Sequence, residues 1–385
     1  MRHRIWWAAA ALSLGACGQD AIAPSAVKAT DQPVFARGDA GDDEQDGRAG
    51  VYALSNNASS NAVIAFARAS DGQLTPAGTF PTGGRGSGGG LGSQGAVVLS
   101  ENGQRLYAVN AGSNDITSFL VTNNGLVRVA TILSGGTRPI SIAVGHGVLY
   151  VLNAGGSGNI TGFRAGEDGR LDAIPNSTRP LSSSASGPAQ VGIIPSGRAL
   201  VVTEKATNKI TTYLLGSGGA PGAPIVNASA GRTPFGFTFD QHGVLIVSEA
   251  FGGAANASAA SSYLVNADGT LSIVSASVPT TETAACWFVV TKNGRFAYTT
   301  NTGSASVSGY GVKDGALRLL DADGKTGNTD PTPLDAALSV NSRYLYVQTG
   351  TGFINAFRVD EATGTLRLIP GVAGLPASTV GLAAR

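Results

Sequence analysis

Leu106-Tyr107-Ala108-Val109-Asn110 is a short apolar strand that ends in a polar side chain. Six more segments of this kind occur along the chain, at residues 51–56, 149–153, 200–204, 245–249, 296–301 and 345–349. The copies end at residues 56, 110, 153, 204, 249, 301 and 349, and this spacing is the repeat length of a propeller blade. The sequence therefore predicts one repeated unit instead of two unrelated domains.

Each copy is surrounded by further short strands. Residues 96–103 form a strand of small residues that runs into an Asn-Gly turn, and residues 116–119 form the next strand after the copy. Asn124-Gly125 then provides another tight turn before a fourth strand. Alternating apolar residues joined by Asn-Gly turns are typical of antiparallel hairpins. The unit is therefore predicted to be a four-stranded antiparallel sheet, and the fold class to be all-β.

The two ends of the chain are predicted to complete one blade together. Seven innermost strands are expected to begin near Gln94, Pro139, Pro188, Pro234, Ala285, Pro333 and Ser378. The strand from Ser378 to Arg385 has no partner strand after it, and the blade that begins at Val51 has no strand before it. Pairing these two segments leaves no open sheet edge between the ends. We predict a seven-bladed β-propeller over residues 51–385, closed by the C-terminal strand joining the N-terminal blade.

The N-terminus has the features of a lipoprotein signal peptide. Arg2, His3 and Arg4 precede a short apolar stretch, and Leu14-Gly15-Ala16-Cys17 matches a lipobox with Cys17 as the lipidated residue. The apolar stretch is too short to span a bilayer. We expect residues 1–16 to be removed and residues 17–50 to form a flexible polar tether. The protein is then exported and anchored to a bacterial membrane by its lipid, on the periplasmic or surface side of the outer membrane.

The charge balance restricts the partners. The chain has 26 Lys and Arg against 25 Asp and Glu, a formal net charge of +1. A nucleic-acid partner would require a basic face, so none is expected. The lipid is the only predicted contact with a membrane, and the protein is expected to be a monomer that binds a small anionic molecule.

Polar side chains are predicted to meet where the innermost strands begin and the second strands end. From the strand ends come Asn110, Asn153, Glu204, Glu249 and Asn301, and from the strand starts Gln94, Arg138, Gln190, Trp287 and Asp335. Glu204 and Glu249 depart from the Asn pattern and are the candidate catalytic residues. Arg138, Lys205, Gln190, Trp287, Asn110, Asn153 and Asn301 are the candidate ligand-binding residues. For the asparagines the alternative is that they only bond local backbone.

No metal or cofactor is expected. After the signal peptide only His146 and His242 remain, each in a turn at the end of its strands opposite the predicted site. This placement argues against a Ser-His-Asp triad and against a His-ligated metal. Gly84-x-Gly86-x-x-Gly89 matches a dinucleotide-binding pattern but opens no helix, so we interpret it as a flexible loop.

Three stretches resemble the lactonase-type propellers, which include 6-phosphogluconolactonase and carboxymuconate lactonizing enzyme. They are residues 106–115, 202–208 and 285–290. The resemblance implies lactone chemistry by a histidine, two arginines and a glutamate around the channel mouth. The histidine falls at Ala189, an Arg-His pair at Pro234-Phe235, and the second arginine at Leu334. Only the glutamate has a counterpart, at Glu249.

Two functions follow from these observations. As an enzyme, the protein would hydrolyse or form a small carboxylated lactone without a metal, with Glu249 as general acid or base and Arg138 or Lys205 holding the anionic group. As a lipid-anchored binding protein, it would use the same channel mouth to recognise a ligand or a protein without chemistry. A propeller fold serves both functions, so the sequence leaves both open.

Overall fold

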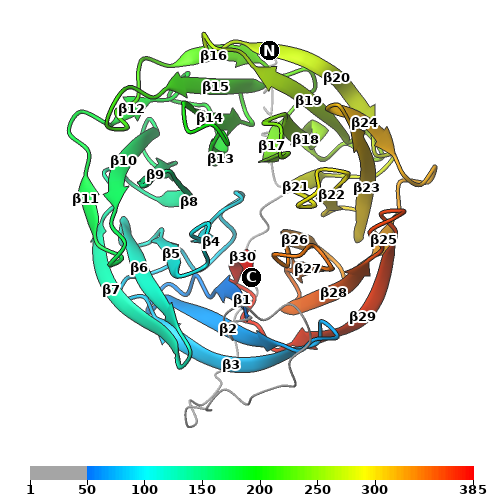
Figure 1. Cartoon of the computed structure of the whole chain (residues 1–385), viewed down its shortest axis with the longest axis horizontal. Helices are drawn as coiled ribbons and strands as arrows, with labels where there is room; N and C mark the ends of the chain where they lie inside the picture. Colours follow the sequence, from blue (N-terminus) through cyan, green and yellow to red (C-terminus); the bar gives the residue numbers. More distant parts are fainter. Residues whose placement is uncertain (1–49) are drawn as a thin grey trace, which may run out of the picture.

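The computed structural model describes residues 50–385 and confirms the predicted fold (Figure 1). Seven antiparallel sheets are arranged around a central channel, and the first strand of the chain pairs with the last. We number the sheets as blades 1 to 7 in chain order. The predicted signal peptide, Cys17 and most of the tether lie outside the described residues.

Blades 1 to 4 occupy the first part of the ring. Blade 1 is formed by β1 (Gly50–Leu54), β2 (Ala62–Arg68), β3 (Leu74–Pro81) and β30 (Val380–Ala384). Blade 2 is formed by β4 (Val97–Leu99), β5 (Arg105–Asn110), β6 (Asp115–Thr122) and β7 (Gly125–Leu133). Blade 3 is formed by β8 (Pro139–Gly145), β9 (Val148–Asn153), β10 (Asn159–Ala165), β11 (Leu171–Ala173) and β12 (Arg179–Pro180). Blade 4 is formed by β13 (Pro188–Ile193), β14 (Ala199–Glu204), β15 (Lys209–Leu214) and β16 (Ile225–Ala228).

Blades 5 to 7 complete the ring. Blade 5 is formed by β17 (Pro234–Phe239), β18 (Leu245–Glu249), β19 (Ala259–Val265) and β20 (Leu271–Pro279), with the 3-10 turn η1 (Phe251–Gly253) after β18. Blade 6 is formed by β21 (Ala285–Val290), β22 (Phe296–Asn301), β23 (Ser306–Lys313), β24 (Ala316–Leu319) and β25 (Gly327–Asn328). Blade 7 is formed by β26 (Pro333–Leu338), β27 (Tyr344–Thr349), β28 (Phe353–Val359) and β29 (Leu366–Ala373). In blades 3 and 6 two short strands share the outermost position.

The ring is closed by β30, which forms the innermost strand of blade 1. Val51 is paired with Ala384 and Ala53 with Leu382 in an antiparallel register. The Ser378 hydroxyl donates to the Ser55 carbonyl at 2.7 Å and ties the start of this segment to the same blade. The closure predicted from the unpaired ends is confirmed, and it removes the sheet edge that separate termini would leave.

Adjacent blades are joined by tyrosines from the repeated strand. The Tyr346 hydroxyl of blade 7 donates to the carbonyl of Gly72 in blade 1 at 2.8 Å, and Tyr298 of blade 6 donates to Gly364 of blade 7 at 2.8 Å. Both glycines have a positive φ, which a turn at this place requires. Buried tyrosines need a partner for the hydroxyl. The tyrosine in the repeated strand and the glycine in the outer turn therefore form one contact between blades.

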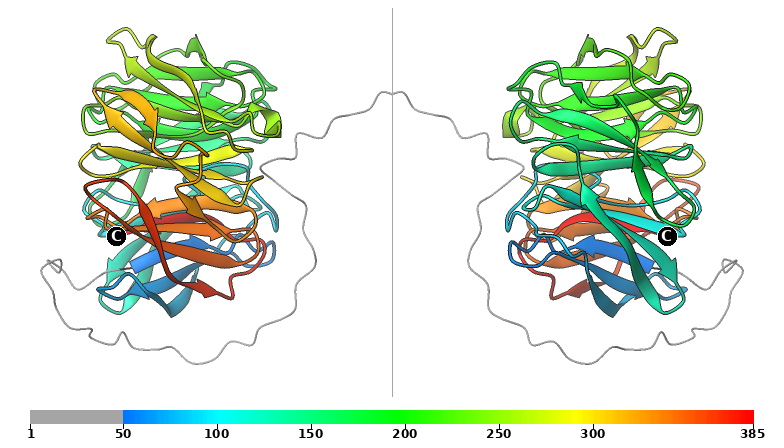
Figure 2. Two further views of the ribbon diagram at one scale, coloured as in Figure 1. Left: turned by 90° about the vertical axis from the view of Figure 1, so that its right-hand side faces the viewer. Right: turned by 90° about the vertical axis from the view of Figure 1, so that its left-hand side faces the viewer.

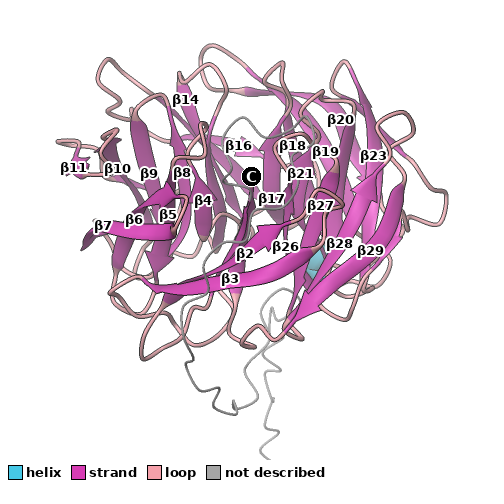
Figure 3. Cartoon of the chain, turned by 60° about the horizontal axis from the view of Figure 1, so that its bottom comes forward, coloured by secondary structure: helices cyan, strands magenta, loops and turns pink. Residues whose placement is uncertain are grey.

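The described chain contains almost no helix, and its two histidines lie where the sequence predicts. Strands account for nearly all regular structure, and η1 is the one helical segment among the described residues (Figure 3). None of the elements in residues 50–385 is a helix long and apolar enough to cross a membrane. His146 and His242 are exposed in the turns that follow β8 and β17, as predicted. Seen from the side, the outer strands of the blades are twisted (Figure 2).

Candidate functional site between blades 3 and 4

The central channel is crossed by the segment that precedes β4. We call residues 91–95 the channel segment, because its atoms bond to the innermost strands of other blades. The Gln94 backbone N–H donates to the Ala189 carbonyl of blade 4 at 3.1 Å. The Gln94 side chain forms two hydrogen bonds with the backbone of Phe288 in blade 6, at 2.8 and 2.9 Å. The Trp287 indole donates to the Ser93 carbonyl at 2.9 Å. The innermost strand of blade 2 begins only at Val97 because the preceding residues cross the channel instead.

The glycine-rich stretch before the channel segment is tightly bonded. Gly86 donates to the Asn57 carbonyl at 2.7 Å, and the Asn56 side chain binds Ser87 and Gly89. A Cβ on Gly86 would lie 2.1 Å from the backbone of Asn56, so only glycine fits this close approach. The interpretation of this stretch as a flexible loop is wrong, because its glycines serve packing.

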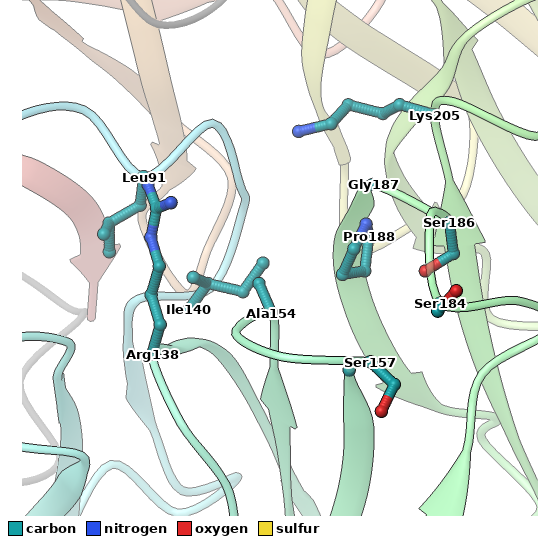
Figure 4. A pocket seen from close by; sticks show the side chains of 11 residues that line it. Leu91, Arg138, Ile140, Ala154, Ser157, Ser184, Ser186, Gly187, Pro188 and Lys205 are labelled. Atoms are coloured by element: carbon teal, nitrogen blue, oxygen red, sulfur yellow. The ribbon is translucent and has the colours of Figure 1, made fainter.

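A cavity of about 260 Å³ lies beside the channel segment, where β8 and β13 begin (Figure 4). Its lining consists of Leu91, Arg138, Ile140, Ala154, Ser157, Gly158, Ser184, Ser186, Gly187, Pro188 and Lys205. This is the face on which the sequence predicted the site. Two cations line the cavity, and no Asp or Glu of residues 50–385 does.

Arg138 enters the cavity from the residue before β8. Its backbone has a φ of 52°, a conformation that is uncommon for a residue other than glycine. The Asn114 side chain holds this conformation by accepting the Arg138 N–H at 2.7 Å, while the Arg138 carbonyl accepts the Ala154 N–H at 2.9 Å. Asn208 holds Thr233 of blade 5 in the same way at 2.7 Å. The exposed Arg138 side chain is thus fixed at its base and extends into the cavity (Figure 4).

Lys205 enters from the other side, directly after β14. Its ammonium group donates to the Gly92 carbonyl of the channel segment and lies 4.6 Å from the centre of the Phe235 ring. Burial, which penalises the charged form, and to a lesser extent the positive charge of Arg138 together lower the pKa of Lys205 to about 8. The partners of this cation are a neutral carbonyl and an aromatic face.

Glu204 and Glu249 are fully buried at the ends of β14 and β18, and neither lines the cavity. Glu204 accepts hydrogen bonds from the Ser182 backbone at 3.0 Å, from the Ser182 hydroxyl, and from Thr211 at 2.7 Å. Glu249 accepts from the Gly231 backbone at 2.8 Å, from Ser261, and from Ser277 at 2.6 Å. Desolvation raises the pKa of Glu249, which these hydrogen bonds partly offset.

The strand-end asparagines have equivalent internal partners. The Asn110 amide donates to Thr117 at 2.9 Å, the Asn301 amide to Ser308 at 2.8 Å, and the Asn153 amide to Asn159 at 2.8 Å. Each amide is fully buried and bonds the third strand of its own blade. Glu204 and Glu249 each accept one backbone N–H from the adjacent loop in addition to hydroxyl groups of their own blades.

Gln190 and Trp287 also bond within the ring. The Gln190 amide pairs with the backbone of Phe237 at 2.6 and 3.0 Å. With Gln94 it borders a second cavity of about 340 Å³, which is lined by the innermost strands of blades 4, 5, 6 and 7. Trp287 packs against Phe235 with ring centres 5.1 Å apart. The polar ring predicted from the sequence is therefore not formed, because Gln190, Trp287, Asn110, Asn153 and Asn301 have partners elsewhere. Arg138 and Lys205 are the predicted residues that line the cationic cavity.

Sequence reasoning missed the serines of the cavity. Ser184 and Ser186 lie in the loop before β13, and Ser157 lies in the loop after β9. The signal for the first two is the run Ser182-Ser183-Ser184-Ala185-Ser186, which directly precedes an innermost strand.

Comparison with known proteins agrees with the repeat pattern. The sequence model described as "Lactonase, 7-bladed beta-propeller" matches residues 48–179. This part of the chain is similar to that family, and the described chain as a whole has the seven-bladed β-propeller fold. No curated protein matches the sequence.

Solved structures from several bacteria share the fold. A candidate 6-phosphogluconolactonase from Bacteroides fragilis has 19% identity and a TM-score of 0.64, over 89% of this chain and 100% of that one. The periplasmic gluconolactonase of Pseudomonas aeruginosa has 17% identity and a TM-score of 0.65, over 87% and 99%. A protein from Lactobacillus plantarum has 18% identity and a TM-score of 0.69, over 88% and 99%.

The positions that the resemblance assigned to lactone chemistry are apolar here and lie together. Ala189 and Phe235 are buried in one cluster with Trp287, and Leu334 packs against it. Lys205 lies against Phe235 at the edge of this cluster. The two cations Arg138 and Lys205 line the cavity between blades 3 and 4.

Proposed function

We propose that the protein binds a small carboxylated lactone, or the open-chain acid that is its hydrolysis product, in the cationic cavity and interconverts the two. The observation that carries this proposal is the pair Arg138 and Lys205 in a cavity whose lining contains no acid. Two positive charges that meet no carboxylate among the described residues of the lining attract an anion, and the partly enclosed site strengthens this attraction.

The two cations suit different parts of such a ligand. The guanidinium of Arg138 is planar and binds a carboxylate through two parallel hydrogen bonds. Lys205 offers a compact charge that stabilises an oxyanion developing on the lactone carbonyl. Glu204 acts as a positioning residue in this proposal, since Ser182, which it binds, begins the loop that carries Ser184 and Ser186. General acid or base catalysis by Glu249 stays a prediction.

A lactone outside the cytoplasm is compatible with the predicted signal peptide. The gluconolactonase of Pseudomonas aeruginosa is described as periplasmic, which places one protein of this fold beyond the inner membrane. We propose the same for this chain, with lipid attachment at Cys17, and we propose a monomer without a nucleic-acid partner.

Proton release on a panel of lactones, with and without a carboxylate, tests the enzyme proposal. We expect turnover of carboxylated lactones that falls in Arg138→Ala and in Lys205→Met. Arg170→Ala is the matched control, because Arg170 lies on an exposed turn beside Asp168 at 3.5 Å. Turnover that survives both cavity substitutions would place the chemistry elsewhere.

A binding function without chemistry is the second candidate. It is favoured by the absence of any Asp or Glu from the cavity lining, since lactone hydrolysis commonly uses a carboxylate or histidine as base. Open-chain acids that bind while no lactone turns over would support this candidate.

A further inference from the structure

Lys205 has the surroundings of a reactive amine. Within residues 50–385 it forms no ion pair, and its hydrogen-bond acceptor is the Gly92 carbonyl. Its side chain lies over the Phe235 ring, and the second cation of the cavity is Arg138. Lysines that are nucleophilic near neutral pH are found in apolar surroundings or beside another cation, and Lys205 has both. Burial and Arg138 lower the pKa of Lys205 to about 8, so that a sizeable fraction is neutral near that pH.

We propose that Lys205 is a nucleophilic lysine that forms an imine with small anionic aldehydes and ketones held by Arg138. This inference rests on the proposed anion site and assigns it a covalent reaction. The substrate class is an aldehyde or ketone that carries a carboxylate or a phosphate.

The reaction balances without any further reagent. The lone pair of the neutral amine forms a bond to the carbonyl carbon, and the carbonyl oxygen takes up a proton. The resulting carbinolamine loses water, which carries away the oxygen and both protons of the amine. The product is a C=N double bond at Nζ, and water reverses the reaction. No electron transfer is involved.

The geometry favours Lys205 over the other lysines. The hydrogen bond to Gly92 and the contact with Phe235 fix the amine in the cavity. Arg138 extends into the same cavity and would hold the anionic end of the ligand (Figure 4). Lys313 lies exposed at the end of β23, without such an enclosure, and serves as an internal reference.

Reductive labelling of the purified chain tests this inference. Pyridoxal 5′-phosphate is a suitable probe because it combines an aldehyde with a phosphate. Cyanoborohydride reduces the imine to a stable amine, and peptide mass spectrometry locates it. Near neutral pH we expect labelling of Lys205 at least about tenfold faster than of Lys313, a difference of about 1.4 kcal/mol in activation free energy. Equal labelling of Lys205 and the exposed lysines would overturn the proposal.

Two variants separate the covalent step from anion binding. Arg138→Ala should slow labelling of Lys205 by pyridoxal 5′-phosphate much more than labelling by formaldehyde, which carries no anion for Arg138 to hold and is affected only through the pKa of Lys205. Equal slowing of both probes would contradict the assigned role of Arg138. Arg170→Ala, at an exposed turn, is the control and should leave unchanged both the labelling of Lys205 and the affinity for an open-chain sugar acid. If the wild type binds that acid but Lys205 is not preferentially labelled, the imine proposal fails and the anion site stands. If neither occurs, both fail.

Discussion

Asp335 should make the closure of the ring sensitive to pH. Its side chain lies on β26, is 2% exposed, and accepts the Gly381 N–H of β30 at 2.7 Å. Burial raises the pKa of Asp335 to about 8, against the opposing effect of this hydrogen bond. The folded protein therefore keeps a proton that the unfolded chain has already lost above about pH 4. Because the folded pKa is raised, the contribution of protonated Asp335 to the free energy of unfolding is complete at low pH and is lost as the pH rises toward about 8.

The substitution Asp335→Asn measures this contribution. The amide oxygen can still accept the Gly381 N–H, and the side chain no longer titrates. The difference between the folded pKa of about 8 and the ordinary value for Asp changes the free energy of unfolding by at most about 5 kcal/mol between about pH 4 and pH 9. We expect the free energy of unfolding of the wild type to fall relative to Asp335→Asn over this range, so that the variant is the more stable protein above about pH 8.

Urea unfolding followed by tryptophan fluorescence, at constant ionic strength and several pH values, gives the difference directly. Asp71→Asn, at an exposed turn between β2 and β3, controls for the loss of a surface carboxylate. A difference between wild type and Asp335→Asn that is constant with pH would refute the reasoning. It would mean that Asp335 is already ionised in the folded protein at neutral pH.

Three further predictions concern the ring and the channel. Removal of residues 378–385 deletes β30 and opens blade 1, so cooperative thermal unfolding by circular dichroism should be lost; retention of a sharp transition would contradict closure by this strand. Glu249→Ala leaves the buried Gly231 N–H and two hydroxyl groups without their acceptor, and should lower the free energy of unfolding by about 3 kcal/mol in urea titrations. A loss well under about 1 kcal/mol would show that these hydrogen bonds do not stabilise blade 5. Gln94→Ala removes the acceptor of the Phe288 N–H, so hydrogen exchange at that amide should accelerate while amides in the outer strands exchange as before. Unchanged exchange at Phe288 would argue against a channel segment held in this way.

The fold could be predicted from the sequence because its signals are local and repeated. Each hairpin is specified by two strands and a turn, such as the strand that contains Tyr107, the small-residue strand before it and the Asn-Gly turn between them. Seven copies of this unit specify the ring. The predicted start at Pro139 agrees with β8, because proline fixes the first residue of the strand. The predicted start near Gln94 is early, since the contacts that draw the channel segment across the ring come from residues far away in the sequence, among them Phe288.

The site was less predictable because strand position does not determine where a side chain finds its partner. Glu249 lies at the predicted end of β18, but its partners Ser261 and Ser277 come from the outer strands of the same blade. The positions of Arg138 and Lys205 at the channel face could be predicted, because Arg138 directly precedes β8 and Lys205 directly follows β14. The serine loop was missed because hydroxyl-rich loops are common and only the packing of blades 3 and 4 gives this one a cavity.

Calorimetric titration of the purified chain with an open-chain sugar acid tests the central claim, that Arg138 and Lys205 form an anion site. The account predicts binding that weakens with added salt, and a loss of about tenfold or more in affinity for Arg138→Ala and for Lys205→Met, since a charged hydrogen bond contributes about 1.5 to 3 kcal/mol. Arg170→Ala should bind like the wild type. Affinity that is unaffected by both cavity substitutions, or an absence of binding by folded protein, would contradict the claim.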